Sequence, residues 1–453
     1  MKSIDAALLL GALAVFLSQM YYALPVTSDA YENLRIINYF EGGGSFPIES
    51  TAIDAPPYIY PPIFSLSVFS FKTLSGFPAN FTLGFFSYLF VLLIVYLVYL
   101  LIRNAYSGTE NRNAYSGNGK KSFSVEEKAA LGVLGIFTLP ILIYRLITPI
   151  PETLGLAFFL LSAYFYQKKN YKLLLIVLAI FPLAHSRSFA FTIITLGMAA
   201  ALRKDYLQAA KSSILGLAVF AIYHLAFPIY ASGFENPSIT VPALFEMLPI
   251  LAIAMTLAGT YVIFRKNYKF DFLCASAIFA FILTYFLLPF PFRHVIFLIL
   301  PISFLVAHAL SYDRRVLAVF SVFLALSMVQ AIQMREAPLT AQSVEMMREF
   351  ENYAGENSIA PFKYNYALPY FADKKVVVGA FAEALPDGVQ RSSDLNNYFT
   401  GGESGQKLAV LEKYSIQVGF FEKSEGLGSA EVNSDRKLLE SDKIAAYSFK
   451  TGN

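Results

Sequence analysis

The sequence predicts a mainly α-helical, polytopic membrane protein with about eleven transmembrane helices and a small extracytoplasmic α/β domain at its C-terminus. Three observations support this fold class. Of the 453 residues, 56% are hydrophobic and 15% are charged, whereas soluble proteins carry about 25% charged residues. Apolar runs of membrane-spanning length recur up to residue 333 and then stop. The basic residues gather in alternate loops, as the positive-inside rule requires.

A helix needs about 20 mostly apolar residues to cross a bilayer. The N-terminal run follows only Lys2 and lacks a small-x-small cleavage site, so it is predicted to be a retained span. The runs within 152–202 are short, and two of them also fit re-entrant segments, so the count carries a margin of about two. The predicted spans lie near residues 6–24, 80–102, 129–147, 152–167, 172–185, 187–202, 212–230, 241–264, 271–290, 294–311 and 316–333.

The distribution of Lys and Arg predicts the orientation. With the N-terminus in the cytoplasm, 17 of these residues fall in inner segments and 5 in outer segments before residue 334. This asymmetry predicts a multi-pass protein of the cell membrane with a cytoplasmic N-terminus and an extracytoplasmic C-terminal domain. The five outer bases are Arg35, Lys72, Arg145, Arg187 and Arg293.

Two domains are expected. Residues 1–333 form the membrane domain, with an outer loop at 25–79 and an inner linker at 104–128. The linker contains "NAYSG" twice among Asn, Gly and Ser residues, a composition typical of flexible segments.

Residues 334–453 carry 13 basic and 17 acidic residues, a net charge of −4. Here "TAQSVEMMREFENYA" has the periodicity of an amphipathic helix, and "GQKLAVLEKY" is also helical or turn-rich. The segments "KKVVVGAF", "SIQVGFF" and "KIAAYSF" are typical of short strands. At about 120 residues, this part is expected to bury its own core.

Ionisable residues cluster at the predicted outer ends of the spans. A charge this close to hydrocarbon is costly and usually marks a partner, a cavity or a substrate path. Because four separate turns carry such groups at one depth, we expect a shared polar cavity roofed by the first outer loop. The residues are Asp29, Glu32, Glu41, Glu49 and Asp54 in the first loop, and Glu152, His185, Arg187, Arg293 and His294 farther along the chain.

Local structural roles are the alternative for most of these residues. Asp29 and Glu32 fit a helix N-cap with an acid three residues later, and Glu152 suits the first turn of a helix. Arg145 can snorkel to the interface. The histidines are isolated, and no spacing of His, Cys and carboxylates resembles a metal site. Arg293, between two proline-broken apolar runs, is the residue that a local role explains least.

These features resemble the GT-C superfamily of polytopic, polyprenyl-phosphate-dependent glycosyltransferases, in particular archaeal oligosaccharyltransferase-like and dolichyl-phosphate mannosyltransferase-like proteins. The resemblance rests on an outer loop that begins with acids, "SDAYENLRIINYFEGGGSFP", followed by "APPYIYPPIFSLSVFSFKTLSG". It extends to "TPIPETLGLAFFLL", "LAHSRSFAF", "PFRHVIFLILPISFLVAHAL" and the outer tail "DKKVVVGAFAEALPDGVQRSSDLNNYF". The layout covers the whole chain, although each motif is short.

Two departures qualify the resemblance. Oligosaccharyltransferase catalytic subunits carry a tryptophan-rich acceptor motif, and this chain has no tryptophan, which argues against transfer to Asn-x-Ser/Thr. Protein mannosyltransferases typically pair the acids at the loop start, whereas "SDAYE" separates them by two residues. The identity of the base among the loop acids therefore stays open.

The resemblance implies a membrane glycosyltransferase that moves a sugar from a polyprenyl-phosphate donor to a glycan, lipid or protein acceptor at the outer face. A carboxylate must accept the proton of the acceptor hydroxyl, and fixed positive charge must meet the phosphate. Direct displacement by one base would invert the anomeric centre. Asp29 is the expected base, with Glu32 and Asp54 as alternatives. The expected donor and phosphate residues are Arg293, Arg187, His185, Arg145, Glu152 and His294, and Tyr58 and Tyr60 either stack on a sugar or pack the loop.

The scheme requires no metal, although Mg²⁺ or Mn²⁺ stays open because the related oligosaccharyltransferases use a divalent ion. The partners are the lipid-linked donor, the acceptor and the bilayer, with no nucleic acid. One alternative is a non-catalytic transporter or flippase-like protein for lipid-linked or envelope substrates, which would place polar groups at mid-membrane depth within inverted repeats. A structural envelope protein whose outer domain binds a partner is the other.

Overall fold

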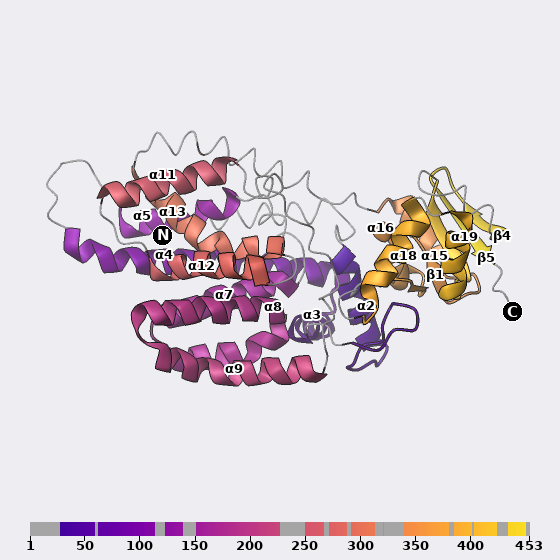
Figure 1. The fold of residues 1–453 in the computed structure, drawn as a ribbon, viewed down its shortest axis with the longest axis horizontal. Helices are drawn as coiled ribbons and strands as arrows, with labels where there is room; N and C mark the ends of the chain where they lie inside the picture. Colours follow the sequence, from indigo (N-terminus) through magenta and orange to yellow (C-terminus); the bar gives the residue numbers. More distant parts are fainter. Residues whose placement is uncertain are drawn as a thin grey trace.

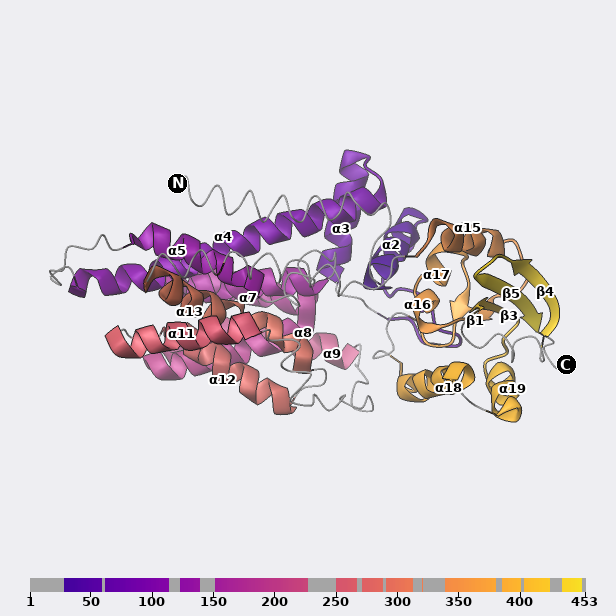
Figure 2. The same ribbon diagram turned by 90° about the horizontal axis from the view of Figure 1, so that it is seen from above.

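The structure is a computed structural model. It describes residues 28–58, 62–113, 123–138, 151–226, 250–266, 271–287, 291–312, 320, 339–379, 385–400, 403–423 and 434–449. A bundle of helices occupies one end of the molecule and a small α/β domain the other, with helices α2 and α3 between them (Figures 1 and 2).

The helical bundle contains most of the apolar runs seen in the sequence. Two shorter helices, α2 (Ser28–Glu41) and α3 (Pro62–Ser75), come from the first outer loop. The bundle itself comprises α4 (Ala79–Asn113), α5 (Val125–Val133), η1 (Leu134–Thr138), α7 (Pro151–Gln167), α8 (Tyr171–Arg203), α9 (Tyr206–Ala226), α11 (Ile250–Lys266), α12 (Phe272–Leu287), η3 (Pro291–Leu298) and α13 (Ile299–Tyr312).

Four of the described helices are long and apolar enough to cross a membrane, judged by length and composition. They are Ala79–Ser107, Tyr171–Arg203, Tyr206–Ala226 and His294–Tyr312, and Ile253–Arg265 and Phe272–Thr284 are shorter apolar helices. The predicted spans near 6–24 and 316–333 lie outside the described residues, apart from Phe320. The count of about eleven spans therefore stays a prediction.

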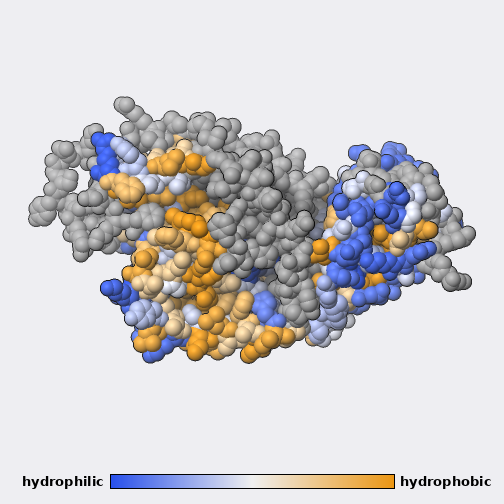
Figure 3. Space-filling view, viewed as in Figure 1, coloured by the Kyte–Doolittle hydropathy of each residue, from blue (hydrophilic) through white to orange (hydrophobic). Residues whose placement is uncertain are grey.

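On the face shown in Figure 3, apolar side chains make up much of the coloured surface of the bundle, and hydrophilic residues cover much of the α/β domain. On α9, Ile214 and Ile222 are each 68% exposed and Leu225 is 84% exposed. A patch of this kind would be unstable against water but suits contact with lipid. The surface therefore agrees with the membrane location that the composition predicts.

Helix α8 folds back on itself. A straight 33-residue helix would be about 50 Å long, yet the Tyr171 hydroxyl at its start donates a 2.9 Å hydrogen bond to Asp205, just beyond its end. The backbone leaves helical geometry at His185 (φ −165°, ψ 100°), three residues after Pro182. The structure thus places a sharp turn between the predicted spans 172–185 and 187–202.

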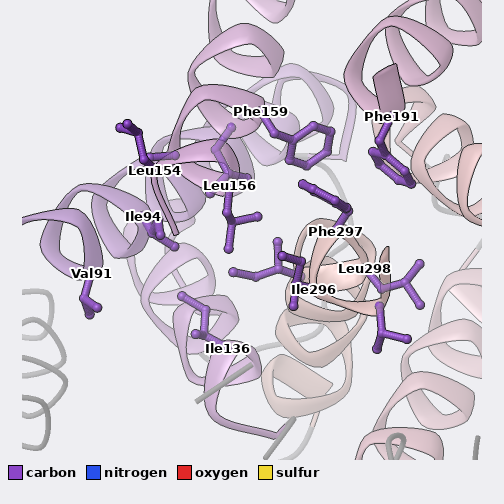
Figure 4. Close-up of a cluster of buried hydrophobic side chains, with 14 of the residues drawn as sticks. Val91, Ile94, Ile136, Leu154, Leu156, Phe159, Phe191, Ile296, Phe297 and Leu298 are labelled. Atoms are coloured by element: carbon purple, nitrogen blue, oxygen red, sulfur yellow. The ribbon is translucent and has the colours of Figure 1, made fainter. Parts of the chain in front are cut away.

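Close approach of helix backbones holds the bundle together. A Cβ atom built on Gly216 of α9 would lie 2.3 Å from the carbonyl oxygen of Leu178 in α8, and one on Gly259 of α11 would lie 2.1 Å from that of Leu305 in α13. Small residues at helix contacts of this kind are typical of membrane bundles. Between these contacts, large apolar side chains such as Phe159, Phe191 and Phe297 fill the interior (Figure 4).

Helix α4 differs from the sequence prediction. It runs on through the first "NAYSG" copy to Asn113, where a flexible linker over 104–128 is predicted. The next helix begins at Val125. Its N-cap residue is Ser124, whose side chain forms a capping box with Glu127. The second "NAYSG" copy lies largely outside the described residues.

The C-terminal domain is a five-stranded sheet with flanking helices. Its strands are β1 (Asn357–Ile359), β2 (Lys375–Val376), β3 (Val418–Glu422), β4 (Ser434–Glu440) and β5 (Ile444–Phe449), in the order β2-β1-β3-β5-β4. The pairs β1–β2 and β1–β3 are parallel, whereas β3–β5 and β4–β5 are antiparallel. Its helices are α15 (Ala341–Phe350), α16 (Phe362–Asn365), α17 (Leu368–Phe371), α18 (Gly388–Thr400) and α19 (Ser404–Lys413).

The sheet does not end at β2. Ala52 of the first outer loop pairs in parallel with Val376, and main-chain hydrogen bonds run from Val376 to Thr51 (2.9 Å) and from Ile53 to Val376 (3.0 Å). The Ile53 side chain is fully buried in the apolar cluster that also holds Val377 and Leu395. The C-terminal domain was expected to bury its own core, but that core includes a residue of the N-terminal loop.

Candidate functional site

A buried polar cluster joins α2 to the rest of the first outer loop. Glu32 is 1% exposed, and both of its carboxylate oxygens accept hydrogen bonds from Arg35, at 3.0 Å from Nε and 2.9 Å from Nη2. The Tyr58 hydroxyl, from the far side of the loop, donates to Oε1 of the same carboxylate. The i, i+3 spacing of the acid and the base on one helix allows the ion pair.

The pKa values of Arg35 and Tyr58 are both shifted by their surroundings in this cluster. Burial alone lowers the pKa of Arg35, but the charge interactions and hydrogen bonds with Glu32 and Tyr58 together outweigh it, so the pKa lies above its usual value. Burial, and then the Glu32 charge, raise the pKa of Tyr58 well above the usual range. Arg35 therefore stays charged and Tyr58 stays protonated at any physiological pH.

Arg35 also fixes the loop that crosses above it. Its Nη2 donates to the main-chain oxygen of Glu49 (3.1 Å) and lies 3.1 Å from the Tyr58 hydroxyl. Ile48 and Tyr58 exchange two main-chain hydrogen bonds, of 2.8 and 2.9 Å, which close the segment between them into a narrow loop. The loop is thus held at its base by Arg35 and the Ile48–Tyr58 bridge, and at its tip by the sheet of the C-terminal domain.

Asp54, one of the candidate bases, lies at this tip. Its backbone has φ 51°, the left-handed conformation that Asp tolerates better than most residues, and its side chain is exposed. The neighbouring Ala55 amide donates to the Ala52 carbonyl (3.3 Å), which closes the turn. Asp54 therefore belongs to the turn that follows residues 51–53, which pair with β2.

A second group of polar residues lies where α7 begins and α8 turns. Glu152, in the first turn of α7, is 7% exposed. One turn later, a Cβ atom on Gly155 would lie 2.9 Å from the His185 Cβ and 2.5 Å from the Ser188 Oγ. The start of α7 thus packs tightly against the turn of α8, and the absence of a side chain at Gly155 allows this approach.

The imidazole of His185 is held at the turn by a local interaction. Its Nδ1 lies 2.5 Å from Ser188 Oγ and 3.2 Å from the Ser188 amide nitrogen, which donates to it. This arrangement resembles a side-chain cap for the second half of α8. Arg187, next to it, is half-buried.

His294 of η3 joins the same end of the bundle from a third segment. It is 1% exposed, and its ring stacks on Phe191 of α8 with centroids 5.9 Å apart and an interplanar angle of 13°. Phe191 in turn stacks on Phe297 (4.4 Å), and both rings contact Phe159 of α7. These aromatic contacts hold η3, α7 and α8 together, and Figure 4 shows the three phenylalanines among them.

The predicted site residues thus fall into two described groups. Glu32, Tyr58 and Asp54 lie in the first outer loop, and Glu152, His185, Arg187 and His294 lie at the ends of α7, α8 and η3. Helix α2 contacts α3, which contacts α8, so the two groups belong to one packed region. The backbones of Asp29 and Arg293 lie in α2 and η3, but their side chains, like all of Tyr60 and Arg145, lie outside the described residues.

In the part of the chain that the structure describes, no three His, Cys, Asp or Glu side chains gather in a way that could hold a metal ion. Three acids of the first loop are paired with bases, Glu32 with Arg35, Glu41 with Lys72 and Glu49 with Lys375. The described residues therefore offer no ready ligand set for Mg²⁺ or Mn²⁺.

Three further residues of this region have little or no signal in the sequence. Arg35 stood out only as one of the few outer bases, although its spacing from Glu32 is that of a helical ion pair. Ile53 and Arg391 were not singled out. Arg391 donates to the Ile53 carbonyl oxygen across 338 residues of sequence, and no local pattern reveals such a contact.

The comparisons with known proteins bear on the fold. No protein-family model and no curated protein matches the chain. The Archaeoglobus fulgidus oligosaccharyltransferase, in complex with Zn and sulfate, is 13% identical with a TM-score of 0.58, over 97% of this chain and 72% of that one. The same enzyme, in complex with an inhibitory peptide and a dolichol-phosphate, is 12% identical with a TM-score of 0.59, over 92% of this chain and 69% of that one.

A second similar enzyme is the arabinofuranosyltransferase AftD from Mycobacteria. It is 13% identical with a TM-score of 0.60, over 99% of this chain but only 40% of its own. Both enzymes are GT-C glycosyltransferases. The chain therefore has the fold of the GT-C membrane glycosyltransferases, as the resemblance of its sequence predicts.

Proposed function

We propose that the protein is a membrane glycosyltransferase that moves a sugar from a polyprenyl-phosphate donor to an acceptor on the outer face of the membrane. The observation that carries the proposal is the likeness, over at least 97% of the chain, to two enzymes that both transfer sugars. The oligosaccharyltransferase binds dolichol-phosphate, which supports a lipid-linked donor here. The acceptor is a glycan, a lipid or a protein.

Asp29 is the proposed base. The carboxylate of Glu32 already accepts three hydrogen bonds from Arg35 and Tyr58, and a base must keep a lone pair for the acceptor hydroxyl. Asp54 lies in an exposed turn beside the C-terminal domain. Asp29 is in the first turn of α2, where the helix dipole favours the ionised carboxylate. One turn from Glu32, it lies on the same side of the helix.

Arg293 is proposed to bind the donor phosphate. It precedes His294, whose contact with Phe191 places the start of η3 beside the turn of α8. His185 and Arg187 lie at that turn, with Glu152 at the start of the adjoining α7. A cluster of cationic and imidazole groups suits a phosphate that gains negative charge as it leaves. Glu152 then orients these bases or contacts the sugar, and Arg145 is a further candidate.

The reaction we propose is a single displacement. The acceptor oxygen attacks the anomeric carbon as Asp29 removes its proton, and the lipid phosphate leaves with the electron pair of the broken bond. The product then has the opposite anomeric configuration. Because phosphate is a good leaving group, this scheme needs no general acid and assigns no step to a metal.

The test is incubation of the purified protein with labelled polyprenyl-phosphate sugars, with donor consumption as the readout. We expect Asp29→Asn to abolish consumption and its matched control, Glu32→Gln, to retain measurable activity. Full activity in Asp29→Asn would refute Asp29 as the base. Movement of the donor across vesicle membranes without consumption would instead support the transporter alternative.

The phosphate site is tested with the same assay. Arg293→Ala should raise the donor concentration needed for half-maximal rate by at least about tenfold, since a charge-assisted contact to phosphate is lost. Arg265→Ala is the matched control, because Arg265 is exposed near the end of α11 on the predicted inner side. Equal effects of the two substitutions would remove Arg293 from the proposed site.

A further inference from the structure

The first outer loop and the C-terminal domain share one sheet. Residues 51–53, here called the added strand, pair in parallel with β2 through an isolated bridge at Ala52, held by two main-chain hydrogen bonds of 2.9 and 3.0 Å. A Cβ atom on Gly379, just after β2, would lie 2.8 Å from the Thr51 Oγ1 and 3.0 Å from the Ala52 nitrogen. The loop therefore packs directly against the edge of the sheet. The main-chain groups of β2 at this edge would otherwise have no neighbouring strand to pair with.

The loop also completes the hydrophobic core of the domain. The Ile53 side chain is 0% exposed and belongs to the same apolar cluster as Leu395, Tyr398 and Phe421. Burial of an isoleucine side chain removes a large apolar surface from water and so stabilises the contact. The domain thus holds the loop by its main chain and by a buried side chain together.

Arg391 of α18 fastens this strand at its end. The residue is 6% exposed, and its Nη1 donates to the carbonyl oxygens of Ile53 (2.7 Å) and Val377 (3.2 Å). The Nε donates to Asp387 (2.7 Å). A buried guanidinium is costly unless its donors are satisfied. Two of the acceptors for Arg391 are the main-chain oxygens of Ile53, in the added strand, and of Val377, the residue after β2.

The added strand is only two residues from the polar cluster of the loop. Glu49, whose carbonyl oxygen accepts from Arg35, precedes Thr51 by two positions. The chain then returns to Tyr58, whose hydroxyl donates to Glu32. A shift of residues 51–53 would therefore displace Glu49 and Tyr58, which contact the Arg35–Glu32 pair from the two sides of the loop. The displacement would be transmitted to α2, the helix that carries Asp29.

From these contacts we infer that Arg391 is a positioning residue for the sugar-transfer reaction. It acts from the C-terminal domain, through the main chain of residues 51–53, and fixes the first outer loop in the geometry that catalysis requires. The inference rests on the proposed function and adds a role for the C-terminal domain. It predicts that loosening the strand changes the rate of the reaction without any change to a residue that contacts substrate.

The first test compares Arg391→Ala and Arg391→Lys with Arg436→Ala in the full-length protein. Arg436 is an exposed arginine on β4, at the opposite edge of the sheet, and its substitution should have no effect. Arg391→Ala should lower kcat by about 10- to 100-fold, because small misplacements of reacting groups cost rates of this size, and should leave KM within about threefold. Arg391→Lys, which keeps a donor near the carbonyls, should restore most of kcat.

A second readout, which does not depend on activity, is hydrogen exchange at the main-chain amides of Ile53 and Val376. These amides form the two hydrogen bonds between the loop and β2. Exchange there should accelerate in Arg391→Ala and not in Arg436→Ala. Faster exchange with an unchanged kcat would overturn the inference while leaving the proposed function intact. Absence of donor consumption in the wild type, with exchange as expected, would refute the proposed function and, with it, the positioning role.

A cysteine pair covers the case in which Arg391→Ala does not fold. Ala52 and Val376 are paired residues on adjacent strands, at a spacing that allows a disulfide, and the native Cys274 is buried in α12. The oxidised Ala52→Cys/Val376→Cys protein should keep at least half of the kcat of its reduced form. Loss of activity on oxidation, with recovery on reduction, would mean that the loop must leave the sheet during turnover and would overturn the inference.

Discussion

Replacement of Arg35 by Met removes the charge that neutralises Glu32 while keeping most of the apolar stem. The wild-type guanidinium makes two hydrogen bonds to the Glu32 carboxylate, at 2.9 and 3.0 Å, and one to the Glu49 carbonyl at 3.1 Å. We expect the variant to be strongly destabilised, because Glu32 is 1% exposed and would keep a buried charge with Tyr58 as its remaining partner in the cluster.

The expected loss of stability in Arg35→Met depends on how deeply the two charged side chains are buried. An exposed ion pair contributes about 0–1 kcal/mol, but removal of one partner of a buried pair costs about 3–5 kcal/mol. The Arg35 side chain is 15% exposed and that of Glu32 is 1% exposed, so the buried case applies. The double variant Glu32→Gln/Arg35→Met removes both charges, and it should recover at least about 2 kcal/mol of that loss.

The assay is a double-mutant cycle on purified protein in mixed micelles, with unfolding followed as SDS is titrated in. The four proteins are the wild type, Arg35→Met, Glu32→Gln and the double variant, and the coupling free energy is the difference between the double and the summed single changes. A coupling below about 0.5 kcal/mol would refute the reasoning, because two residues in a buried ion pair must be energetically coupled.

Two further predictions concern packing and pH. Gly216→Ala should destabilise the protein by about 1–3 kcal/mol through overpacking against the Leu178 carbonyl. The control Gly197→Ala, with no atom within 4 Å of the new Cβ, should be neutral or stabilising by up to about 1 kcal/mol. Thermal unfolding in detergent compares the two variants, and equal losses of stability would contradict the α8–α9 contact. Burial alone raises the pKa of Asp394, but hydrogen bonds from Lys413 and Tyr414 outweigh it and hold the pKa below its usual 3.8. The stability that Asp394 gives over Asp394→Asn should therefore be present above about pH 4 and fade as the pH falls below it, and a difference that grows with acidity would contradict this sign.

Local periodicity predicted much of the C-terminal domain. The spacing of Val344, Met347 and Phe350 gave the helix α15, in which all three are buried, and the apolar runs gave β3 and β5. Strand β4 was missed because "SDRKLLE" is charged, as suits an edge strand. The predicted strand "KKVVVGAF" is only two residues long in the structure, where it pairs with β1 on one side and with Ala52 of the outer loop on the other.

The candidate site was less predictable, for a physical reason. Charges at the ends of spans are visible in a sequence because hydrocarbon excludes them, so Glu152, His185 and His294 could be identified. Whether a given acid is available for catalysis depends on its partners, and these come from elsewhere in the chain. Glu32 takes one partner from its own helix and another from Tyr58, 26 residues away. The sequence alone therefore could not separate Glu32 from Asp29.

In the proposed mechanism, Asp29 and Glu32 of α2 have opposite requirements. A structural acid is most useful when buried and fully neutralised, as Glu32 is, because the buried pair then fixes the loop relative to the helix. A base needs an unshared lone pair and contact with the acceptor, the role that we propose for Asp29, one turn earlier on the helix. The same arrangement explains why the loop is fastened at two points. Arg35 and Tyr58 hold its base to α2, and the C-terminal sheet holds its tip, so the start of α2 can meet a substrate without the loop itself being free to move.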